Sequence, residues 1–123
     1  MRPKILYVED KPERLFLMKA FLQRQGYEVF TAGSGREAME LVKDNSVQLA
    51  VIDYYMPEVN GDVVAQRIKA MRPALPILIF SGSLSLPDRI MAMVDGFIST
   101  SEDPHLLLDK IAELLPLRHA QAS

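Results

Sequence analysis

Short apolar runs alternate with longer segments of helical periodicity along almost the whole of this 123-residue chain. The runs lie at residues 5–8, 27–31, 48–53, 77–80 and 96–99. Nearly continuous apolar strands are typical of a parallel sheet that is covered on both faces. Strands that alternate with helices indicate right-handed crossovers. We therefore expect an α/β fold, a three-layer sandwich with five parallel strands and five helices.

Residues with capping or helix-stopping properties separate these segments. Serine and aspartate accept hydrogen bonds from the first turn of a helix, proline suits its first position, and glycine or proline ends it. Ser34 with Glu37 has the spacing of a capping box. Asn60-Gly61 has the chemistry of a turn. The residues expected to begin helices are Pro12, Ser34, Ser85, Asp103 and Pro104, and those expected to end them are Gly26, Pro73 and Pro116.

The size of the chain predicts one domain, residues 1–116, followed by a short tail or linker stub at 117–123. A net charge of −2 with scattered Lys and Arg gives no basic stripe, so we do not expect direct binding of nucleic acid. The lack of cysteine excludes disulfides and thiolate metal sites. No stretch approaches the roughly 20 apolar residues needed to cross a membrane. We expect a cytoplasmic protein.

Oxygen-bearing side chains stand where four of the apolar runs end. Glu9 and Asp10 follow the first, Asp53 ends the third, Ser81 follows the fourth and Thr100 follows the last. The carboxyl ends of parallel strands share one edge of the sheet, where ligands bind in such folds. Carboxylate oxygens suit Mg²⁺. The pattern therefore predicts a site for a hard cation and a phosphoryl group.

Each feature alone also has an ordinary explanation. An acid after a strand is often a solvated loop residue, and Ser81 alone could be a cap or a turn residue. Met91 and Met93 could be simple packing. His105 and His119 have no partner spacing that indicates zinc or a catalytic triad. The functional prediction rests on the occurrence of these polar residues together, each at the end of a predicted strand.

The motifs around these strand ends resemble the receiver domain of two-component response regulators. They are Tyr7-Val8-Glu9-Asp10, Val51-Ile52-Asp53-Tyr54-Tyr55-Met56-Pro57, Asn60-Gly61 and Phe80-Ser81-Gly82. The resemblance covers essentially the whole chain. It implies a flavodoxin-like sheet with the strand order 2-1-3-4-5.

The resemblance also implies a role for each acid. Asp53 is expected to be the phospho-acceptor that takes a phosphoryl group from a phosphohistidine on a histidine kinase or a phosphotransfer protein. Asp10 and Asp53 are expected to bind Mg²⁺ directly, Glu9 mainly through water, and Tyr55 through its backbone carbonyl. A cation is needed because a carboxylate and a phosphoryl group repel each other.

A switch and an output surface are implied as well. Ser81 corresponds to the hydroxyl that senses the phosphoryl group, and Phe97 to the aromatic residue that moves with it. Partner contacts, with an output domain or in a homodimer, are expected on the surface of the last two helices. Candidate contact residues are Met91, Met93 and Leu106.

The end of the last strand departs from the family pattern. Most members have a lysine and a proline there, whereas this chain has Thr100 and Ser101, and no Lys or Arg lies between Arg89 and Lys110. Losing a donor aimed at developing charge costs roughly 10²–10³-fold in rate. We therefore expect slower phosphoryl transfer or altered switching, with metal binding retained. The loop after the strand is expected to follow a different path.

Two other functions stay open at this point. A pseudo-receiver would bind partners independently of phosphorylation, and Thr100-Ser101 favours it while the acids oppose it. A flavin carrier of the flavodoxin type would share the fold, but fold is weak support for function. Glu9-Asp10 would repel a cofactor phosphate at the first turn.

Overall fold

The computed structural model describes residues 2–82 and 86–115. These residues form the strands β1 (Lys4–Val8), β2 (Glu28–Ala32), β3 (Leu49–Asp53), β4 (Ile77–Ser81) and β5 (Gly96–Ser99). The helices are α1 (Pro12–Arg24), α2 (Gly35–Asp44), α3 (Gly61–Met71), α4 (Asp88–Met93) and α5 (Pro104–Leu114). The predicted alternation of five strands and five helices is confirmed. Ser85, Pro116, His119 and the predicted tail lie outside the described residues.

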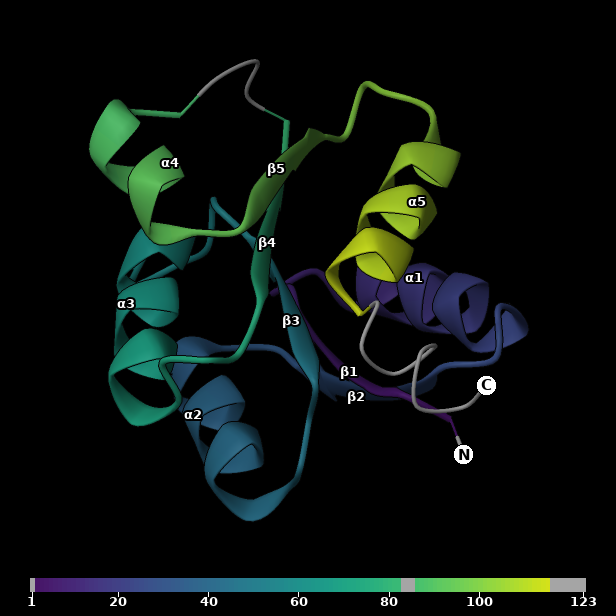
Figure 1. Cartoon of the computed structure of the whole chain (residues 1–123), viewed down its shortest axis with the longest axis horizontal. Helices are drawn as coiled ribbons and strands as arrows, with labels where there is room; N and C mark the ends of the chain where they lie inside the picture. Colours follow the sequence, from purple (N-terminus) through teal and green to yellow (C-terminus); the bar gives the residue numbers. More distant parts are fainter. Residues whose placement is uncertain (1, 83–85, 116–123) are drawn as a thin grey trace.

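All strand pairs are parallel, and the order is β2-β1-β3-β4-β5. Figure 1 shows α2, α3 and α4 on one side of this sheet and α1 and α5 on the other. The predicted three-layer, flavodoxin-like sandwich is therefore confirmed. The strand order changes direction between β1 and β3, which brings the ends of these two strands together at the carboxyl edge.

Burial on both faces of the sheet explains the continuous apolar runs. Successive residues of β1 point to opposite faces and belong to two separate core clusters. Leu6 packs under α2, α3 and α4, whereas Ile5 packs under α1 and α5. Fully burying one such side chain contributes about 1.5–3 kcal/mol. A central strand with both faces buried is held firmly, so its carboxyl end is a fixed platform for polar side chains.

Two predicted caps are present as hydrogen bonds. The Ser34 side chain accepts from the backbone N–H of Glu37 at 3.2 Å, and the Asp103 carboxylate accepts from the N–H of His105 at 2.9 Å. Pro12 and Pro104 occupy the first turns of α1 and α5. These helix starts could be predicted because each depends on a local feature, either a hydrogen bond from a capping side chain or a proline in the first turn.

The start of α4 was predicted wrongly. We expected Ser85 to cap this helix, but the first helical residue is Asp88 and Pro87 occupies the N-cap position. Leu86 precedes a proline, which disfavours the helical conformation for that residue. The helix therefore begins only after Pro87, and it is short.

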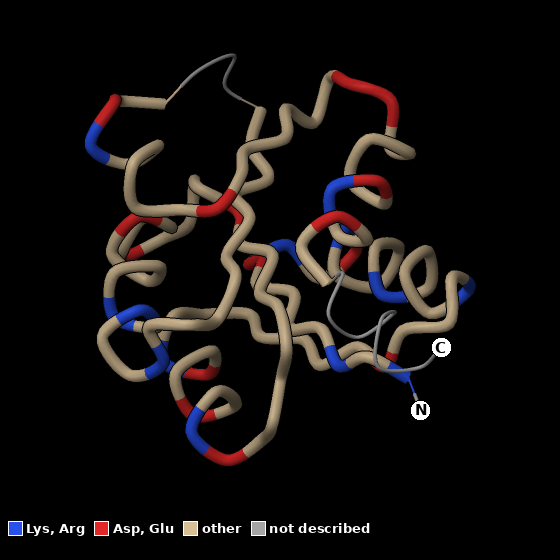
Figure 2. The backbone as a smooth tube through the Cα atoms, viewed as in Figure 1, with Lys and Arg blue, Asp and Glu red and all other residues tan. Residues whose placement is uncertain are grey.

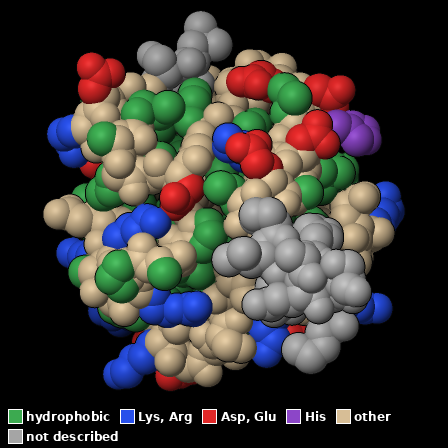
Figure 3. Space-filling model, viewed as in Figure 1, with side chains coloured by type: hydrophobic (Ala, Val, Ile, Leu, Met, Phe, Trp, Pro, Cys, Tyr) green, Lys and Arg blue, Asp and Glu red, His purple; other side chains and the backbone are tan. Residues whose placement is uncertain are grey.

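Charged side chains are spread over the helices. Figure 2 shows Lys and Arg on helices of both layers, and Figure 3 shows acidic and basic side chains interspersed with hydrophobic ones on the visible face. Across residues 2–82 and 86–115, no helix is long and apolar enough to span a bilayer.

Candidate functional site

Three carboxylates meet at the carboxyl edge of the sheet. Glu9 and Asp10 follow β1, and Asp53 ends β3, whose residue Ile52 pairs with Val8. One ligand oxygen from each of the three acids lies within 4.8 Å of the others. The Glu9 backbone N–H donates to the carbonyl of Ala32 at 3.0 Å, which extends the pairing of β1 with β2 by one residue. Strand pairing thus fixes where the acids stand.

Two oxygens of this cluster are buried without a hydrogen-bond donor among the described residues. They are Oε2 of Glu9, a residue only 1% exposed, and Oδ1 of Asp10. A buried carboxylate oxygen without a donor is costly. A hard divalent cation would satisfy both oxygens, and carboxylates are the ligands that Mg²⁺ prefers. The residues present therefore fit the predicted metal.

The carboxyl group of Glu9 has a strongly shifted pKa. Burial is the main cause and raises the pKa of Glu9 to about 7. Asp53 adds to the shift because two close carboxylates repel each other and can share a proton, while the positive charge of Arg14 acts in the opposite direction. Without a cation, this acid therefore loses its proton near neutral pH and not near its usual value.

Arg14 and Tyr7 surround Glu9, and sequence reasoning did not identify either of them. Nε of Arg14 lies 3.0 Å from Oε1 of Glu9, and the Tyr7 hydroxyl donates to the same oxygen at 3.3 Å. Burial raises the pKa of Tyr7, so its hydroxyl remains a donor. The sequence does contain a signal for Tyr7. Side chains two residues apart along a strand point to the same face, so Tyr7 is expected beside Glu9, which directly follows β1.

A small pocket opens beside the acids. Its volume is about 180 Å³, and its lining combines strand ends with the first turn of α1: Glu9, Lys11, Arg14, Asp53, Tyr55, Gly82 and Thr100. The Thr100 N–H donates to the carbonyl of Ser81 at 2.7 Å, which joins the ends of β4 and β5. The pocket therefore brings the acceptor predicted at residue 53 together with residue 100, where the resemblance predicts a lysine and this chain has threonine.

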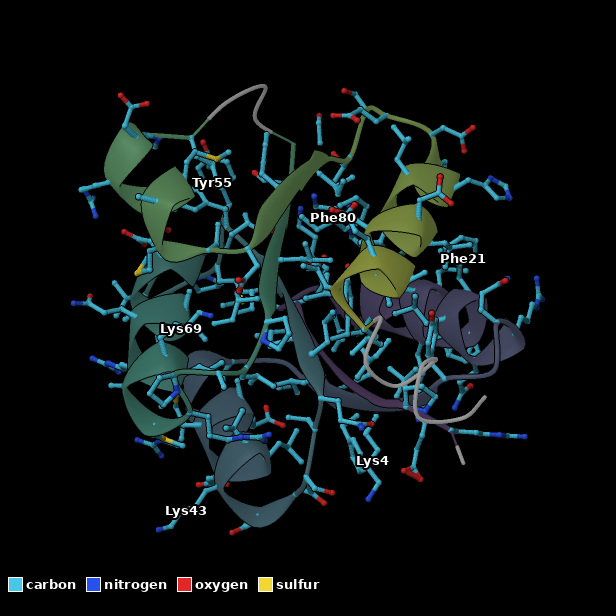
Figure 4. The ribbon with its side chains drawn as sticks, in the orientation of Figure 1. Lys4, Phe21, Lys43, Tyr55, Lys69 and Phe80 are labelled. Atoms are coloured by element: carbon cyan, nitrogen blue, oxygen red, sulfur yellow. The ribbon has the colours of Figure 1, made fainter. Side chains whose placement is uncertain are left out.

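Tyr55 contacts the acceptor through its backbone. Its N–H donates to Oδ1 of Asp53 at 3.3 Å, and its ring meets that of Tyr54 edge-on at a centroid distance of 4.9 Å. The side chain of Tyr55 is exposed. Figure 4 shows Tyr55 on the α4 side of the sheet and Phe80 on the side of α5. The backbone of residue 55, predicted to supply a metal ligand, thus lies beside Asp53.

The predicted switch residues lie on β4 and β5. Ser81 is fully buried at the end of β4, directly before Gly82 of the pocket. Phe97 pairs with Ile79 in the sheet and is half-buried against the core under α2, α3 and α4. Ser81 is thus the chain neighbour of a pocket residue, and Phe97 lies in the neighbouring strand.

The candidate output residues differ in exposure. Met91 and Leu106 are each 42% exposed, whereas Met93 is half-buried and packs against the core. Figure 1 shows β5 at the edge of the sheet between α4 and α5. Met91 and Leu106 therefore suit a partner contact, and Met93 contributes mainly to packing.

Gly61 has a role other than the predicted turn. It is the first residue of α3, and its N–H donates to the carbonyl of Tyr54 at 2.7 Å. The residue with positive φ in this loop is Glu58, at 68°. A Cβ on residue 61 would overlap the carbonyl oxygen of Asp53 and lie 2.9 Å from Cα of Tyr54. Glycine is therefore required here by the close approach of α3 to the end of β3.

We expect Gly61→Ala to lower the free energy of unfolding by about 1–3 kcal/mol, because backbone atoms must move to admit the methyl group. Helix propensity alone would give the opposite sign, since alanine is favoured over glycine by roughly 0.5–1 kcal/mol in a helix. Urea unfolding would measure the change. Gly33→Ala is the control, since its nearest neighbour is the flexible Glu37 side chain at 3.4 Å. A gain in stability for Gly61→Ala would contradict this packing.

Comparison with known proteins agrees with this geometry. Residues 5–112 match the family described as the response regulator receiver domain. The transcriptional regulatory protein ZraR of Escherichia coli is 35% identical over 92 residues, which are 75% of this chain and 21% of ZraR. The response regulator GtcR of Aneurinibacillus migulanus is 33% identical over 107 residues, 85% of this chain and 44% of GtcR. The chain thus spans less than half the length of these relatives.

Solved receiver structures superpose along almost their full length. The response regulator TrrA of Thermotoga maritima, in complex with Mg(2+)-BeF, has a TM-score of 0.86 and 29% identity over 92% of this chain and 99% of that chain. TrrA in complex with the histidine kinase ThkA also gives 0.86, with 30% identity over 92% of this chain and 98% of that chain. The fold, the cluster of acids and the family match show that this chain belongs to the response regulator receiver domain family.

Proposed function

We propose that the chain accepts a phosphoryl group on Asp53 from a phosphohistidine and thereby switches its interaction surface in a two-component signalling system. One observation carries the proposal: Asp53 shares a pocket with Glu9 and lies beside Asp10, and two buried oxygens of this cluster have no donor among the described residues. Such a site suits a divalent cation beside a nucleophilic carboxylate.

The chemistry follows from the arrangement. An oxygen of Asp53 attacks the phosphorus, the P–N bond to the donor imidazole breaks, and its electron pair stays on the histidine nitrogen. A carboxylate carries no proton that a base would have to remove. Glu9, Asp10, Asp53 and the backbone carbonyl of Tyr55 would hold Mg²⁺, which when bound screens the repulsion between carboxylate and phosphoryl oxygens. We propose that the chain catalyses only this transfer to itself.

The proposed partners follow from the same site. TrrA has been solved with a histidine kinase, and we propose a histidine kinase or a phosphotransfer protein as the donor here. Ser81 would sense the phosphoryl group and Phe97 would respond in β5. The exposed Met91 and Leu106 would then contact an output domain, another protein or a second copy of the chain. We place this activity in the cytoplasm, where ATP-dependent kinases provide phosphoryl groups.

The direct test is phosphorylation by acetyl phosphate with Mg²⁺, followed by intact mass measurement. The chain should gain the mass of one phosphoryl group, and EDTA should prevent the gain. A folded protein that gains no mass from acetyl phosphate or from phosphoramidate would refute the proposal.

A pseudo-receiver is the second candidate, favoured by the neutral Thr100 in the pocket. It predicts equal binding of a partner by the wild type and by Asp53→Asn, with and without a phosphodonor. The proposed function predicts that only the wild type responds to the donor. Pull-down of a kinase or an output partner under the four conditions separates the two.

A further inference from the structure

The phosphoryl pocket receives its positive charge from the start of α1. Among the described residues that line it, Lys11 and Arg14 carry the cationic side chains, and the end of β5 contributes the neutral Thr100. A phosphoryl group brings about −1.5 to −2 charges into this space. Hydrogen bonds from a cationic donor to such an anion are roughly twice as strong as neutral ones. Beside the metal, the cationic side chains that can face the product therefore come from the α1 side of the pocket.

Arg14 is held at the pocket with donor capacity left over. Its guanidinium carbon lies 5.3 Å from the centre of the Phe80 ring, and this residue directly precedes Ser81 at the end of β4. Nε lies 3.0 Å from Oε1 of Glu9 but is buried without an aligned hydrogen-bond partner. Packing on an aromatic face, a hydrogen bond with the Tyr7 side chain and attraction to one carboxylate thus fix the group, and a guanidinium with five N–H donors has others to offer.

Asp53 lies within the electrostatic reach of the same guanidinium, and both residues line the pocket. A guanidinium presents five N–H donors in a planar fork, so it can keep one contact with Glu9 and offer others to a phosphoryl oxygen. Lys11 is different, because it is exposed at the N-cap of α1. An exposed ammonium is strongly hydrated and flexible.

We propose that Arg14 is the catalytic cation of this receiver, donating hydrogen bonds from α1 to the phosphoryl group on Asp53 and so replacing a donor that Thr100 cannot supply. The inference rests on the phosphorylation of Asp53 proposed above. With acetyl phosphate, the bond from an Asp53 oxygen to phosphorus forms and the bond to the acetate oxygen breaks. The electron pair leaves with acetate, and Arg14 stabilises the phosphoryl oxygens without transferring a proton.

The test compares rates of phosphorylation by acetyl phosphate at saturating Mg²⁺. Arg14→Met should be slower by roughly 10²–10³-fold, the usual effect of removing one donor from developing charge. Arg14→Lys should keep part of the rate. The double variant Arg14→Met/Thr100→Lys should regain much of it, because a cation returns from the opposite wall. Arg24→Met, on the exposed end of the same helix, is the matched control and should equal the wild type.

A second measurement separates charge stabilisation from damage to the site. Titration with Mg²⁺ alone should show that Arg14→Met binds the metal at least as tightly as the wild type, since it removes a cation beside Glu9. A parallel loss of metal affinity would overturn the proposal, as would a wild-type rate in folded Arg14→Met, or a double variant as slow as Arg14→Met alone. If Arg14→Met does not fold, Arg14→Gln takes its place in every comparison. A wild type that gains no phosphate would refute the proposed function itself.

Discussion

Asp53→Asn is expected to abolish phosphorylation of this chain. The amide has nearly the same shape as the carboxylate but lacks its charge and nucleophilicity, so the bond to phosphorus cannot form at a useful rate. Removing a nucleophile costs roughly 10³-fold or more in rate. Intact mass after incubation with acetyl phosphate and Mg²⁺ should show no phosphorylated species.

Asp62→Asn is the matched control for this change. Asp62 lies in the first turn of α3 and pairs with Arg89 at 3.6 Å, outside the cluster of acids. Its replacement should leave the mass gain intact. Phosphorylation of Asp53→Asn at the rate of the wild type would show that another residue accepts the phosphoryl group.

The second large effect concerns the dependence of stability on pH without metal. Because burial and the nearby Asp53 raise the pKa of Glu9 to about 7, from 4.5, the native state holds a proton that the unfolded state has lost. This contribution is complete below the unfolded pKa and is lost as pH rises through the folded pKa. In EDTA, the free energy of unfolding should fall by roughly 3 kcal/mol between about pH 4.5 and pH 8.

Glu9→Gln isolates this effect, because glutamine does not titrate. The variant should be more stable than the wild type at pH 8 and should lack this part of the slope. Mg²⁺ at pH 8 should stabilise the wild type more than the variant, since ligands stabilise the state that binds them. Urea unfolding at several pH values, with and without Mg²⁺, measures the stability at pH 8, its slope with pH and the effect of the metal. Equal slopes for the wild type and Glu9→Gln would contradict the account of this buried acid.

The strands and the acids could be predicted because they depend on short, local patterns. Ile5 to Val8 form a central strand with both faces buried, so the run is apolar throughout and its polar end is easy to locate. Parallel pairing then brings such ends to one edge, whatever the loops do. These two rules together predict that Glu9, Asp10 and Asp53 lie at one edge of the sheet.

The parts that the sequence did not reveal depend on tertiary contacts. Gly61 fits a turn by composition, but the requirement for glycine comes from the carbonyl of Asp53, eight residues earlier. Arg14 is one of several charged residues in α1, and a tertiary contact that the sequence does not show, its guanidinium over the Phe80 ring, distinguishes it. Pro87 is a better signal than Ser85 for the start of α4, because a proline disfavours the helical conformation of the residue before it.

Mapping the phosphorylated residue tests the central claim most directly. Borohydride reduces an aspartyl phosphate to homoserine, releasing phosphate, and peptide mass spectrometry then locates the changed residue. After reaction with acetyl phosphate and Mg²⁺, the account predicts homoserine at position 53 and none at position 10. A reduced residue elsewhere, or phosphorylated protein without any change at position 53, would contradict it.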